Sequence, residues 1–264
     1  MTLLGGKTAV VHGGGGTVGG AVAREFARQG ASVFLAGRRA GRVGAAAAEI
    51  RAMGGVAEAA RVDALDASAV EEHMDAVAAR AGGIDVCLNA VGIPQRGLQG
   101  TPLLELDPER FVSPISACAR THFLTATSAG RRMAAQGSGV ILTLTATPAR
   151  AAAPVVGGMG PAWAAVEALT RGLAAELGPH GVRVLCVRSH AMPETPLIGE
   201  VTDMIAEGAG VTPQELRSAM AAGTLLGRLP GPAEVAALAA FLASDRAASM
   251  TGTVANVSSG ALVD

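Results

Sequence analysis

The sequence predicts an α/β domain in which helices cover both faces of a parallel sheet. Short runs rich in Val, Ile and Leu alternate along the chain with longer segments of helical periodicity, which is the pattern of successive βαβ units. The length of 264 residues suits one such domain, since single domains of this class run to roughly 250 residues. We therefore expect one folded unit, residues 1–264, built around seven strands.

The seven expected strands are short and enriched in Val, Ile or Leu. This is the character of strands that are covered on both faces, as in a parallel sheet. They span residues 8–11, 32–36, 56–62, 86–89, 140–144, 182–187 and 254–257.

Helices are expected in the segments between these strands. They span residues 18–28, 44–53, 68–80, 108–135, 162–177 and 233–243. Asp107 followed by Pro108 is typical of a helix start, with an N-cap and a proline in the first turn. Pro114 conflicts with this pattern because proline removes a backbone donor inside a helix, so the helix is expected to begin later or to kink there. Residues 189–222, with several Pro and Gly, are expected to form a partly helical substrate lid.

Composition argues against several classes of function. The formal net charge is −1 and no basic run is longer than two residues, so the footprint of a nucleic-acid-binding protein is absent. The longest apolar run, residues 236–243, is far shorter than the roughly 20 residues that span a bilayer, and no secretory signal is recognisable. We expect a cytoplasmic protein that acts on a small molecule and has no membrane partner.

The three cysteines do not indicate a metal or disulfide site. Cys87, Cys118 and Cys186 are far apart and odd in number, which fits neither a disulfide framework nor a zinc site. Cys87 and Cys186 are expected to be small buried apolar residues, and no metal is expected.

A glycine-rich stretch between the first strand and the first helix predicts nucleotide binding. Residues 12–19 read HGGGGTVG, in which Gly14, Gly16 and Gly19 match G-x-G-x-x-G. In this setting glycines allow a tight turn and close approach of backbone donors, while the helix N-terminus attracts a pyrophosphate. The alternative is a glycine turn that only permits tight packing. The first interpretation implies a Rossmann-type doubly wound fold with a parallel seven-stranded sheet and helices on both faces.

Arginine follows the second strand where an acidic residue would hold the ribose hydroxyls of NAD. A guanidinium at this place, Arg38 in the sequence Gly37-Arg38-Arg39, suits the additional phosphate of NADP. NADP(H) is therefore expected rather than NAD(H), unless the two arginines are simply solvated.

These motifs together resemble the short-chain dehydrogenase/reductase family over essentially the whole chain. The glycine stretch is similar to the TGxxxGxG of that family, with His12 in place of threonine and Thr17 in place of the middle glycine. Residues 85–92, DVCLNAVG, resemble DVLVNNAG, and residues 225–260 are similar to the closing helix and strand of the family. The resemblance implies that Asp63 contacts the adenine. The expected cofactor-binding residues are Gly13, Gly14, Gly16, Thr17, Val18, Gly19, Arg38, Asp63, Asn89 and Gly92.

The resemblance also implies that all four catalytic residues of the family are replaced. The helix AAVEALTRGLAAELGPHGVRV aligns without gaps, so the Tyr and Lys of the family fall on Met159 and Trp163. By the same alignment the family serine falls on Ala146 and the asparagine on Cys118. A shifted alignment cannot restore the pair, because the chain has no tyrosine and its single lysine is Lys7. Trp163 is expected either to plug the core or to form a wall of the ligand pocket.

The remaining polar candidates near the inferred pocket are His190, His122 and Thr145, with Thr147 beside them. His190 follows the sixth strand, His122 lies one turn after Cys118 on the same helix face, and Thr145 precedes Ala146. A histidine can act as general acid or base near neutral pH. Each histidine can equally have a structural or surface role.

Two hypotheses from different classes remain. In the first, the protein is an atypical NAD(P)(H)-dependent oxidoreductase or related catalyst. Its small apolar substrate needs no strong proton donor, as with an activated alkene or iminium, or the proton comes from His190 or water. In the second, it is a noncatalytic member of the family that binds a nucleotide or small ligand, or serves as partner subunit of an active relative. The resemblance also implies a homodimer or homotetramer formed through the fourth and fifth helices.

Overall fold

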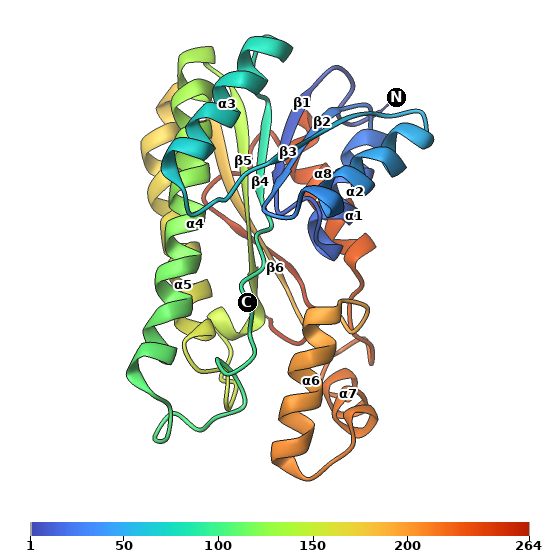
Figure 1. Ribbon diagram of the computed structural model, residues 1–264, viewed down its shortest axis with the longest axis vertical. Coiled ribbons are helices and arrows are strands. Elements are labelled where there is room, and N and C mark those ends of the chain that lie inside the picture. The colour runs from blue at the N-terminus through green and yellow to red at the C-terminus, as the bar shows by residue number, and fades with distance from the viewer. Residues whose placement is uncertain (1, 264) are drawn as a thin grey trace.

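The computed structural model describes residues 2–263. At its centre lies a parallel sheet of seven strands, which follow one another in the order β3-β2-β1-β4-β5-β6-β7 (Figure 1). The order reverses between β1 and β4, and such a reversal leaves a crevice at the carboxyl ends of the two strands. The predicted doubly wound α/β fold is thus confirmed. The strands are β1 (Thr8–His12), β2 (Ser32–Gly37), β3 (Val56–Arg61), β4 (Val86–Asn89), β5 (Gly139–Ala146), β6 (Val182–Ser189) and β7 (Val254–Val257).

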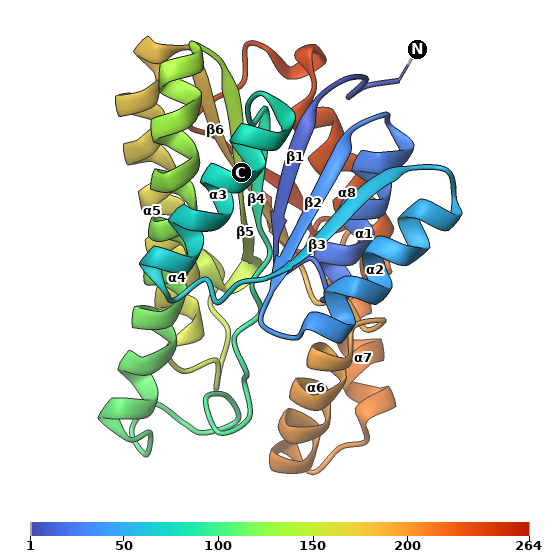
Figure 2. The same cartoon turned by 45° about the horizontal axis from the view of Figure 1, so that its top comes forward.

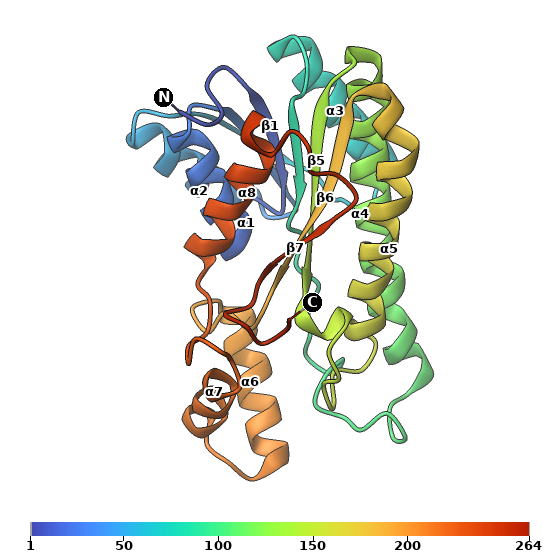
Figure 3. The ribbon, with the colours of Figure 1, turned by 180° about the vertical axis from the view of Figure 1, so that it is seen from behind.

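Helices cover both faces of the sheet. One face carries α1, α2 and α8, and the opposite face carries α3, α4 and α5, as the view from behind also shows (Figure 3). Each layer encloses its own apolar core of small aliphatic side chains, with Phe26 fully buried in the first. The helices are α1 (Thr17–Arg28), α2 (Ala40–Ala52), α3 (Ala67–Ala81), α4 (Pro108–Gln136), α5 (Met159–Leu177), α6 (Pro196–Ala209), α7 (Pro213–Ala222) and α8 (Pro232–Ala243).

Helix α4 begins where its sequence signals place it. The Asp107 carboxylate accepts hydrogen bonds from the backbone N–H groups of Glu109 and Arg110, at 2.9 and 3.2 Å. The helix then continues through Pro114 to Gln136, so the expected later start is wrong. Pro114 lies only in the second turn, where its missing N–H costs one intrahelical bond.

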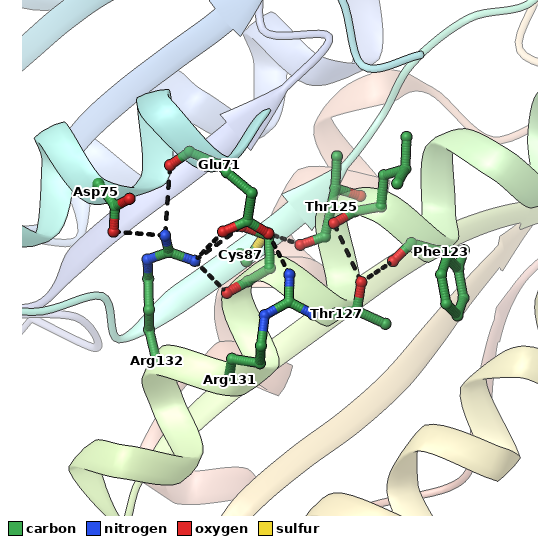
Figure 4. Close-up of polar contacts among 10 residues, drawn as sticks. Glu71, Asp75, Cys87, Phe123, Thr125, Thr127, Arg131 and Arg132 are labelled. Atoms are coloured by element: carbon green, nitrogen blue, oxygen red, sulfur yellow. Dashed lines mark hydrogen bonds and ion pairs between the residues drawn. The ribbon is translucent and has the colours of Figure 1, made fainter. Parts of the chain in front are cut away.

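Ion pairs join α3 to α4 on the outer face (Figure 4). Arg132 donates to Glu71 at 2.9 Å and to Asp75 at 2.6 Å, and Arg131 also pairs with Glu71. About two turns earlier on α4, the Thr125 carbonyl oxygen lies 3.9 Å from the Cys87 thiol of β4. The ion pairs therefore join α3 to the C-terminal part of α4, whereas the middle of α4 packs on β4.

Residues 189–222 form two helices that extend beyond the carboxyl ends of the strands (Figure 2). Helix α6 is capped by Thr195, and α7 begins with a capping box between Thr212 and Glu215. The expected partly helical character is confirmed, whereas the role as a lid stays a prediction. None of the helices within residues 2–263 combines the length and the apolar character needed to cross a bilayer.

Candidate active site

The glycine stretch forms a tight loop between β1 and α1 whose backbone leaves no room for a side chain at Gly13, Gly14 or Gly19. Gly13 has φ of +79°, and a Cβ there would lie 2.3 Å from the carbonyl oxygen of Ala90. A Cβ on Gly19 would lie equally close, 2.3 Å, to the carbonyl oxygen of Gly13. Gly14 packs on Leu35, 2.9 Å from where its Cβ would be. These glycines are therefore required by the loop itself, before any ligand is considered.

The N-terminus of α1 is open and carries no internal anion. Its N-cap residue Gly16 makes no side-chain cap, and the first turn has no acidic residue. Gly16 and Thr17 are exposed, while Val18 is half-buried. The first N–H groups of a helix lack intrahelical partners and carry partial positive charge, so this end suits a phosphate. The loop fits the pyrophosphate of a dinucleotide.

The other expected cofactor residues surround this loop at the carboxyl ends of the strands. Arg38 and Asp63 follow β2 and β3 and are exposed, and Gly92 lies in open space. Asn89 is buried, donating to the Thr125 hydroxyl at 2.9 Å and accepting from the Val91 N–H at 2.9 Å. The Asn89 side chain therefore fixes the start of the loop after β4 to helix α4.

Three of the four positions that the resemblance predicts as catalytic, Cys118, Met159 and Trp163, meet in an apolar cluster. Cys118 is 4% exposed and Met159 is 1% exposed, and both pack with Ala162 and Val166. Trp163 is half-buried and packs against this cluster, and its role as a wall of a ligand pocket stays a prediction. Ala146 is half-buried at the end of β5.

None of the cluster residues offers a proton at neutral pH. A methionine thioether has no transferable hydrogen, and an indole N–H is a donor without positive charge. Burial raises the pKa of the Cys118 thiol to about 11, so that the thiol stays neutral. The Tyr–Lys type of acid, in which a cation lowers a phenol pKa from about 10, has no counterpart in this cluster.

A hydrogen-bonded pair lies just beyond the ends of β5 and β6. The Thr147 hydroxyl and Nδ1 of His190 are 2.8 Å apart, and the His190 backbone N–H donates to Val257 at 3.2 Å. Burial lowers the pKa of His190 below its ordinary value. The ring is thus held by Nδ1 and is neutral at pH 7.

The two other polar candidates have their hydrogen bonds inside the protein. His122 is buried, its Nδ1 lies 2.9 Å from the Cys118 carbonyl oxygen, and burial lowers its pKa to about 4. The Thr145 hydroxyl donates to Oε1 of Glu167 at 3.0 Å. Both side chains are therefore oriented by internal partners.

Thr145 contacts a buried ion pair that sequence reasoning missed. Arg188 on β6 and Glu167 on α5 form a two-pronged contact, with Nε–Oε1 of 2.7 Å and Nη2–Oε2 of 2.6 Å. Their side chains are only 4% and 7% exposed. Both segments carry further charged residues, Arg171 and Glu176 in α5 and Arg183 in β6. The sequence therefore had no signal that singled out this pair, and only the fold brings the two side chains together. Within residues 2–263, no group of three or more His, Cys, Asp or Glu side chains gathers as metal ligands would.

A second buried group lies below the glycine loop, on the α3 side of β1. His12 is 1% exposed, and neither of its ring nitrogens has a partner among residues 2–263. Its ring meets that of His73 on α3 edge to face, with centroids 6.1 Å apart. Burial, and secondarily the neighbouring His73, lowers the pKa of His12 to about 3.

We expect this histidine to make the fold sensitive to acid. Because the folded pKa lies below the unfolded value, the unfolded chain binds more protons between about pH 3 and 6.5, so stability falls as the pH decreases through that window. His12 alone should remove about 2 kcal/mol of unfolding free energy between about pH 7.5 and 5. Urea unfolding at both pH values measures this difference.

The matched variants are His12→Thr and His180→Thr. His180 is exposed, so its replacement should leave the pH dependence as it is, whereas His12→Thr should reduce the loss in acid by about 2 kcal/mol. An unchanged loss in His12→Thr would show that His12 is not the group that titrates on unfolding.

Comparisons with known proteins agree with this architecture. Residues 15–261 match the profile of the family described as enoyl-(acyl carrier protein) reductase. L-rhamnose 1-dehydrogenase (NAD(P)(+)) of Azotobacter vinelandii is 33% identical over 267 residues, covering 99% of both chains. Cis-4-hydroxycyclohexanecarboxylate dehydrogenase of Sinomonas cyclohexanicum is 33% identical over 254 residues, covering 96% of both chains.

A solved structure of similar sequence has the same fold. The structure of 7α-hydroxysteroid dehydrogenase complexed with NADH and 7-oxo glycochenodeoxycholic acid superposes with a TM-score of 0.86 at 27% identity, covering 99% of this chain and 96% of that one. The profile match extends over nearly the whole chain. The chain therefore belongs to the short-chain dehydrogenase/reductase family.

Proposed function

We propose that this protein is an atypical NADP(H)-dependent oxidoreductase that acts on a small apolar substrate without a Tyr–Lys acid. The observation that carries this proposal is the contrast between the region expected to bind the cofactor and the region expected to hold the catalytic residues. The glycine loop and the open end of α1 keep the geometry of a phosphate site, whereas Cys118 and Met159 are sealed in an apolar cluster.

Cofactor binding is assigned to the residues around the loop. The backbone donors of residues 16–19 would hold the pyrophosphate, and Asp63 would contact the adenine. Arg38, exposed at the end of β2, favours the additional phosphate of NADP through its planar guanidinium. A bound nicotinamide would supply or accept the hydride.

His190 is the residue that we assign to proton transfer. Thr147 holds Nδ1 at 2.8 Å, which leaves Nε2 to exchange a proton. The lowered pKa of His190 makes the neutral imidazole the main form at pH 7, and this form accepts a proton from a substrate that is being oxidised. In the reducing direction, the chemistry fits an activated alkene or iminium that needs no strong acid, with water as proton source.

A titration followed by fluorescence tests this function. NADPH should bind more tightly than NADH, and absence of binding of both at about 1 mM, an affinity limit of about 4 kcal/mol, would exclude the oxidoreductase. His190→Ala should abolish oxidation of the substrate by NADP⁺, in which the imidazole accepts the proton, whereas Met159→Phe, which keeps the cluster apolar, should retain it. The reverse result would show that the chemistry lies at position 159.

A noncatalytic role is the second candidate, favoured by the sealing of Cys118 and Met159. In that case the chain binds a nucleotide or small ligand, or acts as partner subunit of an active relative. Binding of NADPH with no turnover in a screen of alcohols, ketones and activated alkenes would support it. Substrate-dependent loss of NADPH absorbance would exclude it.

We further propose that residues 189–222 close over the substrate. The two helices α6 and α7 extend beyond the sheet at the end that carries His190 (Figure 1).

We also propose that the protein is a homodimer or homotetramer formed through α4 and α5. On α4, Phe123 is 51% exposed, which is unusual for a large aromatic side chain. A light-scattering mass equal to the monomer mass of 26.1 kDa would contradict the assembly.

A further inference from the structure

Two glutamines in the loop between β4 and α4 are buried although each keeps a polar end without a partner. Gln95 and Gln99 are 4% and 7% exposed, and the amide nitrogen of Gln99 donates to the side-chain oxygen of Gln95. Across residues 2–263, neither Nε2 of Gln95 nor Oε1 of Gln99 has a further hydrogen bond. Both atoms still reach solvent, unlike the sealed ring nitrogens of His12. Because buried polar groups ordinarily have partners, this free donor and free acceptor suit a ligand.

The loop that carries the two glutamines lies between the apolar cluster and α6. Ile93, two residues before the first glutamine, packs against the Cys118–Met159 cluster. The Gly100 backbone N–H, directly after the second glutamine, donates to the Val155 carbonyl oxygen at 2.8 Å. A Cβ on Gly100 would lie 3.9 Å from Cβ of Met204 on α6. The glutamines are therefore held between the start of α5 and the segment proposed to close over the substrate.

The segment before α5 that this loop contacts has a strained backbone. Val155 has φ of +53°, which is a rare conformation for a β-branched residue. Gly157 has φ of +59°, and a Cβ there would lie 2.3 Å from the carbonyl oxygen of Leu98, between the two glutamines. Strain of this kind persists only where the surrounding structure enforces it, and it is concentrated at ligand sites. The tight contact fixes the position of the loop.

We propose that Gln95 and Gln99 bind a neutral amide group of the substrate, a carboxamide or a lactam, an assignment that rests on the function proposed above. The ligand carbonyl would accept from Nε2 of Gln95, and the ligand N–H would donate to Oε1 of Gln99. Exchanging oxygen and nitrogen in both side chains reverses the bond between them but still leaves one free amino group and one free carbonyl. A carboxylate has no donor for that carbonyl. The substrate class is thus an apolar molecule that carries an amide.

The test follows the side-chain amide signals of both glutamines in the ¹⁵N-labelled full chain during titration with three probes. These are cyclohexanecarboxamide, methyl cyclohexanecarboxylate and cyclohexanecarboxylate, whose saturated ring does not stand in for nicotinamide. We expect saturable shifts with the carboxamide. The ester and the carboxylate should bind at least about tenfold more weakly, because neither has an N–H donor and each leaves a glutamine group unpaired. Arg96 between the glutamines is exposed, so tighter binding of the carboxylate would show that charge selects the ligand and would overturn the proposal.

Gln95→Met should remove the preference for the carboxamide over the ester, since it deletes the donor and keeps an apolar side chain of similar length. Gln214→Met is the matched control, because Gln214 is exposed on α7, and it should keep the preference. The proposal is overturned if the carboxamide gives no saturable shifts at Gln95 and Gln99, if the ester binds as tightly, or if Gln95→Met keeps the preference. Should Gln95→Met lose its native circular dichroism spectrum, the comparison of the three probes in the unmodified chain decides.

None of the three probes requires turnover, so a titration of the same samples with NADPH and NADH separates this proposal from the proposed function. Binding of NADPH without a preference for the carboxamide would remove only the assignment of Gln95 and Gln99. A preference for the carboxamide in a chain that binds neither nucleotide would remove only the oxidoreductase.

Discussion

Replacing Arg188 with alanine is expected to destabilise the protein by about 3–5 kcal/mol, because it leaves the Glu167 carboxylate buried without its cation. Both side chains of the pair are almost fully covered, and without the guanidinium the carboxylate would keep only its hydrogen bond from the Thr145 hydroxyl. Urea unfolding, followed by the fluorescence of the single tryptophan Trp163, measures the loss.

The double variant Glu167→Leu with Arg188→Met separates two contributions to this loss of stability. One is the loss of the ion pair itself, and the other is the cost of a buried carboxylate without its cation. Well-packed apolar residues often replace a buried ion pair at little cost, so the double variant should be more stable than Arg188→Ala. Arg24→Ala is the control, since the Arg24–Glu49 pair is 39% and 60% exposed and such pairs contribute about 0–1 kcal/mol. A loss of unfolding free energy below about 1 kcal/mol in Arg188→Ala, as for an exposed pair, would contradict this prediction.

Replacing Gly16 with aspartate is expected to weaken NADPH binding by about 100-fold or more while the fold remains stable. The new carboxylate would cap the first N–H groups of α1 and repel the pyrophosphate from the place that these groups provide. Aspartate is a good N-cap residue, so helix stability should rise by a few tenths of a kcal/mol. Gly16 already has an extended backbone, with φ of −87° and ψ of 165°, which aspartate readily adopts. Its Cβ would lie 3.2 Å from the Gly13 carbonyl oxygen, so the loop has to shift by a few tenths of an ångström and part of the gain in helix stability is lost.

Fluorescence titration with NADPH measures the expected loss of affinity, and urea unfolding of the same sample measures the stability of the fold. Gly172→Asp adds the same charge on the exposed side of α5, where a Cβ meets no atom within 4 Å, and should bind NADPH normally. If Gly16→Asp keeps its affinity, the phosphates do not bind at the end of α1. The glycine loop would then have only the packing role that the sequence left open.

Local sequence signals were enough to predict the elements that local physics determines. The apolar runs gave the seven strands, and the glycines of residues 12–19 marked a loop in which Gly13 adopts a positive φ. Strands β5 and β6 extend further than expected, to Ala146 and Ser189, because their last residues are polar or small and lack an apolar signal. Helix α5 begins at Met159, three residues before the predicted start, since the stretch with Gly160 and Pro161 reads as a loop.

Contacts between distant segments were beyond the reach of the sequence. Thr147 and His190 were each recognised as candidates, but their contact depends on the pairing of β5 with β6, which aligns Ala146 with Ser189. The partnership of Glu167 with Arg188 depends on the same packing of α5 against β6. In both cases the residue types show which side chains can form a hydrogen bond or an ion pair. Only the pairing of the strands and the packing of the helix show which of these side chains meet.

The apolar cluster around Met159 also bears on whether tyrosine chemistry can be rebuilt in this chain. A tyrosine placed at position 159 would bring its hydroxyl among Cys118, Ala162 and Val166, where an unpaired buried hydroxyl costs about 1–3 kcal/mol. It would also lack the cation that lowers a phenol pKa, because Trp163 stands where the alignment predicts the lysine. Met159→Tyr alone is therefore expected to be unfavourable. A successful redesign would have to change Trp163 and the packing around position 159 at the same time.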